Sequence, residues 1–445
     1  MYESLVVHEF DTIISNEEYK DSPRFKYLPQ KYFDELVSFV KEFTSSDSET
    51  DTTEFLKIGY RKGVKDTVSI NNYVGLIELP SGFQIEILPK VEFKGENDED
   101  RTKKVFLEML KSLKDFEGKA FTSASLKADR MNLYEVVINM YIKEVQTLVK
   151  HGIKSSYNET EDNLKYYKGK LKVSNHIKMN LVHKERFYVQ FDEYTVNRAE
   201  NRLVKSTLLK LMKLSKSDEN IKEIRQLLTA FELVEASTNY DKDFSYVKID
   251  RNTKDYELLM IWSKIFLYNK SFTTFAGKTS SKALLFPMER VFEEYVARRM
   301  KRVWGEEDWD VSAQDKGYHL FDSPKRFSLR PDIVARRGDD LVIMDTKWKR
   351  LYPDVHNYGI SQADMYQMYV YSQKYSKESK KKPEVWLLYP LSEKSAEIGE
   401  PEFYSEDGVW VHIYFIDVDS KNIEDSLKTL LSKVYKRLDE SVTVG

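Results

Sequence analysis

A short apolar run that ends in polar residues is the feature that most constrains this chain. Leu341–Met344 is entirely apolar, which predicts a strand buried on both faces of a sheet. Alternation along a strand then places Asp345 and Lys347 on the same face. A turn at 336–339 joins this strand to an earlier one that follows Asp332. The sequence therefore predicts two carboxylates and one ammonium at a single edge of a buried sheet.

These three side chains suggest a metal site that hydrolyses phosphodiesters. An ion buried without a partner costs several kcal/mol, and Mg²⁺ prefers oxygen ligands. We expect Asp332 and Asp345 to bind Mg²⁺, with Mn²⁺ as the alternative ion. Lys347 would then orient or deprotonate a water, or neutralise charge in the transition state. Glu293, on a helix predicted over 287–303, is the expected third carboxylate ligand, with Glu289 one turn earlier as its alternative.

The residues around the Asp345–Lys347 motif are more informative than the motif itself. An acidic residue two positions before a lysine also occurs at 18–20, 117–119 and 419–421. The plain alternative is a strand-end ion pair between Asp345 and Lys347. Gln367 and Tyr371 share one face of a helix predicted over 361–377. Three interpretations of Gln367 are open: it supports the site, it contacts DNA, or it forms an ordinary surface pair with Tyr371.

The order of elements predicts a mixed α/β chain with three regions. Region 1–100 is expected to be β-rich, with a helix over 29–44 and a hairpin over 73–88. Region 101–270 is expected to be mainly helical, with an extended stretch over 155–195. Region 271–445 combines helices with antiparallel and further strands, which predicts a mixed sheet flanked by helices.

Several segments together resemble a known nuclease family. Pro331-Asp332, Asp345-Thr346-Lys347, Phe292–Tyr295 and Gln367 with Tyr371 resemble the PD-(D/E)xK nuclease core. More narrowly, the chain resembles McrC, the nuclease subunit of McrBC modification-dependent restriction systems. This likeness is carried by the following further segments: 75–80 with 87–90, 167–171, 191–196 with Asn201-Arg202, and 330–332.

The resemblance implies a function and a partner. A McrC-like protein docks on a ring of McrB, an AAA+ GTPase, stimulates GTP hydrolysis and cuts double-stranded DNA in phage defence. It implies catalytic roles for Asp332, Asp345 and Lys347, and supporting roles for Glu293 and Gln367. In that family a β-rich N-terminal element enters the ring, so region 1–100 is the expected docking region, with the 73–88 hairpin as a candidate.

Two alternatives stay open at this stage. One is an autonomous PD-(D/E)xK nuclease without a motor, and the other is a non-catalytic adaptor that activates an AAA+ ring. Composition restricts the other kinds of site that the chain can hold. The 445 residues include no Cys, which excludes thiolate metal sites and Cys nucleophiles. No apolar run approaches the length of a membrane span, so we expect a cytoplasmic protein without a membrane partner.

Overall fold

The computed structural model describes most of the chain, in two compact units. The described residues are 4–44, 55–91, 99–110, 112–113, 133–268, 282–378, 382–419 and 421–443. The first unit contains the described residues up to 133 and from 282 onward, and the second contains 134–268. The predicted regions 1–100 and 271–445 thus share one unit. The predicted mixed α/β class is confirmed.

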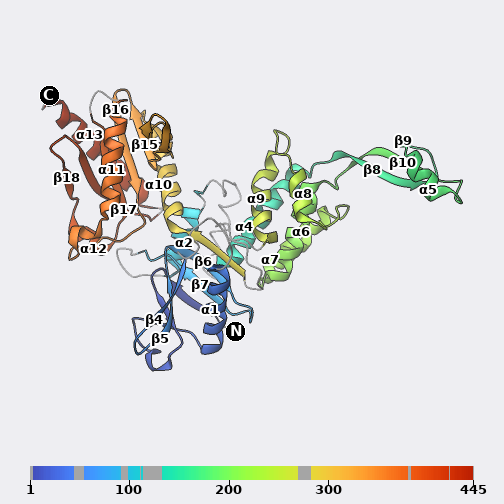
Figure 1. Cartoon of the computed structure of the whole chain (residues 1–445), viewed down its shortest axis with the longest axis horizontal. Helices are drawn as coiled ribbons and strands as arrows, with labels where there is room; N and C mark the ends of the chain where they lie inside the picture. Colours follow the sequence, from blue (N-terminus) through green and yellow to red (C-terminus); the bar gives the residue numbers. More distant parts are fainter. Residues whose placement is uncertain are drawn as a thin grey trace. The chain divides into compact units, whose positions relative to one another are not determined.

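A six-stranded mixed sheet forms the C-terminal part of the first unit (Figure 1). Its order is β12-β15-β16-β17-β19-β18, and the pairs β16–β17 and β17–β19 are parallel, whereas the others are antiparallel. The strands have these bounds: β12 Asp310–Ala313, β15 Ile333–Arg337, β16 Asp340–Thr346, β17 Glu384–Pro390, β18 Glu402–Tyr404 and β19 Trp410–Ile416.

Helices cover both faces of this sheet. Helix α11 (Gln362–Tyr375) packs Met368, Tyr371 and Tyr375 against alternate buried residues of β16, β17 and β19. Helices α10 (Met288–Gly305) and α13 (Ile423–Thr443) pack against each other, and the Trp304 indole of α10 donates to the Leu427 carbonyl of α13. Coverage on both faces explains why the run Leu341–Met344 is entirely apolar.

The strand predicted after Asp332 is β15, which begins at Ile333. Two further strands precede it, because β14 (Lys325–Ser328) pairs with β13 (His319–Asp322) in a separate two-stranded sheet. The predicted turn is present, with Gly338 at a positive φ of 60°. Glycine adopts that conformation without the steric cost that other residues meet.

The N-terminal part of the first unit holds two four-stranded sheets and a shared core. Their orders are β1-β7-β6-β11 and β3-β2-β5-β4, and helix α1 (Gln30–Thr44) packs Phe33, Leu36 and Phe39 into the core between them. The strands have these bounds: β1 Ser4–His8, β2 Thr12–Ile14, β3 Lys26–Tyr27, β4 Leu56–Arg61, β5 Lys65–Ile70, β6 Tyr73–Glu78, β7 Gln84–Leu88 and β11 Lys282–Pro287.

The predicted hairpin over 73–88 is present but lies inside this sheet. β6 pairs with β7 on one side and with β11 on the other. The polar residues Gln84 and Glu86 are buried, and Glu86 pairs with Lys103 of α2 (Glu99–Leu110) at 3.1 Å. The hairpin is therefore a structural part of the unit rather than a projecting element.

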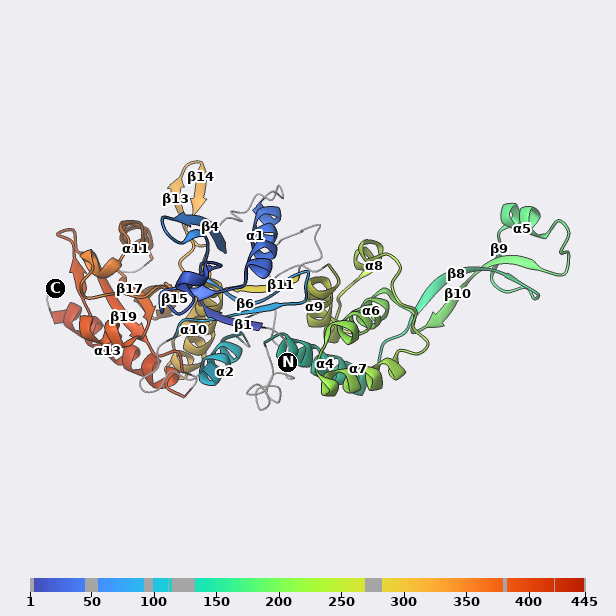
Figure 2. The same ribbon diagram turned by 90° about the horizontal axis from the view of Figure 1, so that it is seen from below.

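The second unit is a helical bundle with a long β-ribbon. The helices have these bounds: α4 Leu133–His151, α6 Ala199–Leu214, α7 Asp218–Ala230, α8 Tyr240–Tyr246 and α9 Glu257–Tyr268. Strands β8 (Ser156–Leu164) and β10 (Phe187–Thr195) run antiparallel along their full length. Figure 2 shows them side by side, leading away from this bundle.

The tip of the ribbon corrects the expectation of an extended stretch over 155–195. Between β8 and β10 lie the short strand β9 (Lys170–Leu171) and helix α5 (Val173–Asn180). Asn180 stabilises this helix end by donating to Asn163 at 2.7 Å and to the Arg186 carbonyl at 3.2 Å. In the described part of the chain, none of the helices has the length and apolarity to cross a membrane.

Candidate nuclease site

The β15–β16 hairpin brings the two predicted carboxylates to the same end of the sheet. Ile333 pairs with Met344, and the same antiparallel register places Asp332 opposite Asp345. Residues opposite each other in an antiparallel pair project to the same face. The local sequence therefore determines this juxtaposition, because a two-residue turn fixes the register of the strands on either side of it.

Thr346 holds Asp332 in place. Its backbone N–H and its hydroxyl group both donate to Asp332 Oδ2 at 2.8 Å. Sequence reasoning gave this threonine no role. Its two hydrogen bonds fix one oxygen of the Asp332 carboxylate and leave Oδ1 without a hydrogen bond from the described residues.

Lys347 joins the carboxylate of its own strand to helix α11. Its ammonium lies 2.6 Å from Asp345 Oδ2 and 3.6 Å from Asp364 Oδ1, and it donates to Gln367 Oε1 at 3.3 Å. Gln367 in turn donates to the Tyr371 hydroxyl at 2.7 Å, so the predicted helix pair does reach the site. Asp364 is an additional member that sequence reasoning missed, although its i, i+3 spacing from Gln367 was visible.

The site concentrates negative charge in a buried place. Burial, reinforced by the charge of Asp332, raises the pKa of Asp345 to about 7. Burial and then Asp332 likewise raise the pKa of Glu293 to about 7. Burial also raises the pKa of Asp332, although the hydrogen bonds from Thr346 oppose this. These carboxylates therefore resist ionising together unless a cation compensates them.

Lys347 is held as an ammonium. Burial alone would lower its pKa, but the adjacent Asp345, Asp364 and Asp332 outweigh burial and raise the pKa of Lys347. A lysine in this state carries a positive charge and does not accept a proton at neutral pH. Of the roles expected from sequence, the geometry favours orienting a water or neutralising charge over deprotonating a water.

The donor set suits a hard cation. Asp345 is 1% exposed, and the partner of its Oδ2 among the described residues is the Lys347 ammonium at 2.6 Å. Mg²⁺ is commonly bound by one or two carboxylates and several waters. Asp332 and Asp345 fit this pattern, although no group of three His, Asp or Glu side chains in the described ranges forms a ready metal-ligand set.

Glu293 and Glu289, the two candidates for a third carboxylate ligand, both lie within electrostatic reach of Asp332. Glu293 of α10 is close enough to Asp332 to affect its own pKa, and its Oε1 accepts a hydrogen bond from Gln314. Glu289 accepts a hydrogen bond from Asn72 at 2.9 Å. The charge of Glu289 likewise raises the pKa of Asp332, and Glu289 lines the groove beside Lys347, so the choice of a third carboxylate ligand between the two glutamates stays a prediction.

A groove beside Lys347 opens toward the N-terminal part of the same unit. Its volume is about 470 Å³, and its lining residues are Phe10, Asn72, Lys90, Glu289, Lys347, Trp348, Lys349, Arg350, Tyr352 and Asp364. Four of these are cationic. Cationic side chains of this kind suit contact with an anionic group.

Glu9 anchors the segment that follows Lys347, and sequence reasoning missed it. The Trp348 indole N–H lies 3.1 and 3.0 Å from the two Glu9 oxygens, and the Lys90 N–H donates to Oε2 at 3.1 Å. Glu9 is fully buried, and burial raises its pKa to about 8. Trp348 also packs on Phe292, the neighbour of Glu293, with ring centroids 5.3 Å apart. Glu9 therefore ties the N-terminal strands to both sides of the site.

Comparisons with known proteins support the McrBC part of the resemblance, and they do not identify the subunit or the PD-(D/E)xK core. Residues 68–390 match the family described as McrBC 5-methylcytosine restriction system component. A curated relative, the type IV methyl-directed restriction enzyme EcoKMcrBC of Escherichia coli (strain K12), is 23% identical over 232 residues. That match spans 49% of this chain and 64% of the relative, less than two thirds of its length.

The fold matches a solved structure over nearly the whole chain. The structure is a refined half-complex from a tetradecameric assembly of Thermococcus gammatolerans McrB AAA+ hexamers with bound McrC. The TM-score is 0.66 at 20% identity, covering 96% of this chain and all of the matched one. Because the family match covers well over half of the residues, the chain belongs to the McrBC 5-methylcytosine restriction system component family.

Proposed function

We propose that this chain is the endonuclease subunit of a McrBC-like restriction complex, with the PD-(D/E)xK type of site and a requirement for Mg²⁺. The observation that carries the proposal is the buried pair Asp332 and Asp345 at the end of a central strand, with the Lys347 ammonium 2.6 Å from Asp345. A structural ion pair needs one carboxylate for one ammonium. Here Asp332 and Asp364 also raise the pKa of Lys347, so negative charge is in excess.

The proposed chemistry assigns each side chain a task. Asp332 and Asp345 would hold the cation, with Glu293 beside Asp332. When bound, the cation would polarise the phosphodiester and make a coordinated water more acidic. The Lys347 ammonium stabilises negative charge that develops on the phosphorus oxygens. Asp364 and Gln367 keep that ammonium aimed at the site, and Thr346 fixes the angle of Asp332.

We further propose that the complex includes an AAA+ GTPase ring that resembles McrB. Family membership supports this partner, and so does the exposed apolar tip of the β8–β10 ribbon. At that tip Val173, Ile177 and Leu181 are 58%, 59% and 74% exposed. Exposed apolar groups of this kind mark interaction surfaces. Because the 73–88 hairpin is enclosed within a sheet, the ribbon is the better candidate for docking.

The test is cleavage of duplex DNA by the chain with its cognate ring, GTP and Mg²⁺. Asp345→Asn keeps the shape of the side chain but removes its charge, and we expect cutting to fall by about a hundredfold or more. Glu406→Gln is the matched control, because Glu406 lies exposed in the loop before β19. Undiminished cutting by Asp345→Asn would overturn the site.

Assays with the same components distinguish the proposed function from the two alternatives, an autonomous nuclease and a non-catalytic adaptor. Cutting by the chain alone with Mg²⁺ would indicate an autonomous nuclease. A non-catalytic adaptor would stimulate GTP hydrolysis by the ring but would take up no Mn²⁺ or Mg²⁺ in a calorimetric titration. For the proposed function we expect metal uptake that Asp345→Asn abolishes, while this variant still stimulates GTP hydrolysis.

A further inference from the structure

A hairpin inserted next to Asp332 has a cationic and aromatic surface to which the proposed cleavage reaction gives no task. Strands β12 and β15 are paired neighbours in the six-stranded sheet, yet residues 314–332 lie between them in the sequence. Much of this insertion forms the β13–β14 hairpin, which is a separate two-stranded sheet. Figure 2 shows β13 and β14 extending beyond the six-stranded sheet.

Both ends of the insertion lie at the proposed cleavage site. The Gln314 backbone N–H donates to the Asp332 carbonyl at 2.9 Å, and the Gln314 side chain donates to Glu293. Phe327 of β14 is five residues before Asp332. Because an extended chain spans at most about 3.6 Å per residue, the Cα atoms of Phe327 and Asp332 lie within about 18 Å of each other. This distance is about half a turn of B-DNA, or about five base pairs.

Contacts with α11 hold the hairpin in one position. Tyr318, at the base of the hairpin, packs on Tyr375 of α11 with ring centroids 4.4 Å apart. Further along the hairpin, Asp322 Oδ2 lies 3.4 and 3.3 Å from the ammonium groups of Lys374 and Lys377. A surface that is already held in place binds a ligand without first losing conformational freedom.

The cationic side chains of the hairpin have no carboxylate partners. Asp322, the one acidic residue of β13 and β14, is already matched by two lysines of α11. Lys325 and Arg326 of β14, and Arg330 just after it, are exposed and form no ion pair with any described carboxylate. The hairpin therefore has positive charge that is available to an external anion.

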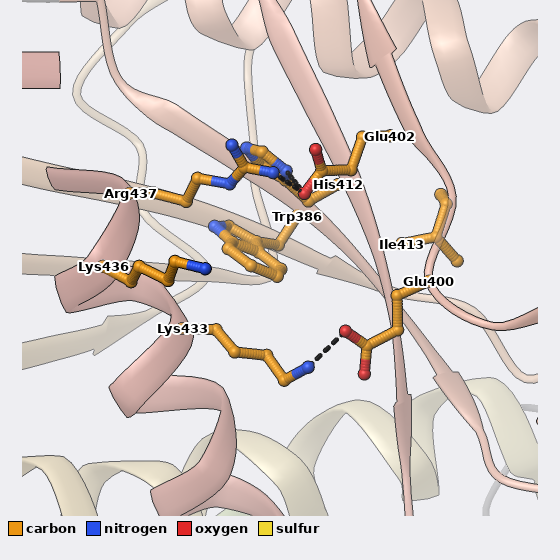
Figure 3. A pocket seen from close by; sticks show the side chains of 8 residues that line it. All are labelled: Trp386, Glu400, Glu402, His412, Ile413, Lys433, Lys436 and Arg437. Atoms are coloured by element: carbon orange, nitrogen blue, oxygen red, sulfur yellow. Dashed lines mark hydrogen bonds and ion pairs between the residues drawn. The ribbon is translucent and has the colours of Figure 1, made fainter. Parts of the chain in front are cut away.

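Cations elsewhere in the same unit are paired within the chain. At the edge of the six-stranded sheet near α13, Lys433 pairs with Glu400 and Arg437 pairs with Glu402 (Figure 3). Ion pairs of this kind neutralise the surface around them. The β13–β14 hairpin differs from that edge because its cations lack such partners.

Two phenylalanine side chains accompany these cations. Phe321 and Phe327 are 55% and 71% exposed, and their ring centroids lie 5.9 Å apart. Phe327 has a left-handed backbone with a φ of 58°, which is unfavourable for a bulky residue. Burial of the ring does not compensate for this strain, and strained residues cluster at ligand-binding sites. Exposed aromatic rings beside cations suit nucleic acid, because bases stack on such rings while cations contact phosphates.

We propose that the β13–β14 hairpin binds duplex DNA beside the phosphate that is cleaved. Lys325 and Arg326 would contact phosphates, and Phe327 would contact the bases. A two-stranded ribbon fits the major groove of B-DNA, which is about 12 Å wide. The inference rests on the proposed function, because the hairpin would position the same duplex that Asp332 and Asp345 help to cut.

The test is fluorescence anisotropy of a short labelled duplex, titrated with the full chain in EDTA so that binding is measured without cleavage. We expect Lys325→Gln/Arg326→Gln to weaken binding about tenfold. Its plot of log K against log salt should be shallower by about 1.8, because each lost phosphate contact removes about 0.9 from the slope. Phe327→Asn retains a residue that tolerates the left-handed backbone, and it should weaken binding about fivefold without changing the slope.

The matched control is Lys421→Gln/Lys428→Gln, which removes two exposed charges in and just before α13. We expect this control to bind the duplex like the wild type, and circular dichroism establishes that each variant is folded. Three results would overturn the proposal: no duplex binding by the wild type, wild-type binding by both hairpin variants, or an equal loss of binding in the control.

Failure of this inference is distinguishable from failure of the proposed function. Weakened binding by the hairpin variants, together with undiminished cutting by Asp345→Asn, would support the hairpin and overturn the cleavage site. Cutting that needs Asp345, with wild-type binding and cutting by the hairpin variants, would overturn only the hairpin. Loss of GTPase stimulation by the hairpin variants, with duplex binding unchanged, would assign the hairpin to the ring and also overturn the inference.

Discussion

At the residue scale, Glu9 makes stability depend on pH. Its pKa is about 8 in the folded chain because of burial, against a usual value near 4.5. Between these values the folded state keeps a proton that the unfolded state has lost. This group therefore favours folding fully below about pH 4.5, and its contribution declines as pH rises to about 8.

Glu9→Gln tests this directly, because glutamine keeps the shape and still accepts from the Trp348 indole. We expect the free energy of unfolding of the variant, relative to wild type, to increase between pH 5 and pH 8.5. Urea unfolding at both pH values measures it. Glu17→Gln, at an exposed glutamate, is the control and should show the smaller change. A difference for Glu9→Gln that is independent of pH would contradict the prediction.

The residues that could be predicted are those whose neighbours are near in sequence. Asp332, Asp345 and Lys347 belong to one hairpin, so alternation and a turn were enough to bring them together. Glu9 contacts Trp348 across 339 positions, and no local pattern carries that information. A glutamate that follows a strand reads as an exposed residue until its tertiary partner is known.

At the element scale, Gly75 controls how closely β6 and β11 approach. Its φ is 148°, and a Cβ added there would overlap the Leu284 carbonyl oxygen. Gly82, in the turn of the same β6–β7 hairpin, has a φ of 83° but open space around its Cβ position. Substitutions at these two glycines therefore distinguish the cost of steric overlap from the cost of an unfavourable backbone conformation.

We expect Gly75→Ala to destabilise the chain more than Gly82→Ala. Gly82→Ala costs about 1–2 kcal/mol of stability, because alanine must adopt a left-handed conformation. Gly75→Ala must in addition displace strand β11. Chemical denaturation of both variants gives the comparison. Equal losses, or a smaller loss for Gly75→Ala, would show that β11 moves without cost.

Elements defined by local periodicity were predicted better than pairings between distant segments. The helices at 287–303 and 361–377 correspond to α10 and α11, and the hairpin over 73–88 corresponds to β6 and β7. The pairing of β6 with β11 joins residues about 200 positions apart, and it encloses a hairpin that the family resemblance had made a candidate for docking. Gln84 and Glu86 are buried because of the β6–β11 pairing and the packing of α2, and the alternation of residues along β7 does not predict their burial.

At the scale of the whole molecule, the site and the exposed ribbon belong to different compact units. Asp332, Asp345 and Lys347 lie in the first unit, and β8 and β10 lie in the second. Cutting and activation of the ring should therefore be separable by changes in one unit or the other.

Removing the ribbon tip is the test of this separation. Leu164 and Phe187 are register partners at the end of β8 and β10, so a short Gly-containing turn can replace 165–186 without altering the strands. We expect this variant to keep the metal uptake of the wild type and to lose stimulation of GTP hydrolysis by the ring. Asp345→Asn should show the reverse, with stimulation retained and metal uptake lost. Full stimulation without the tip would assign docking to another surface, and loss of metal uptake would show that the two units are coupled.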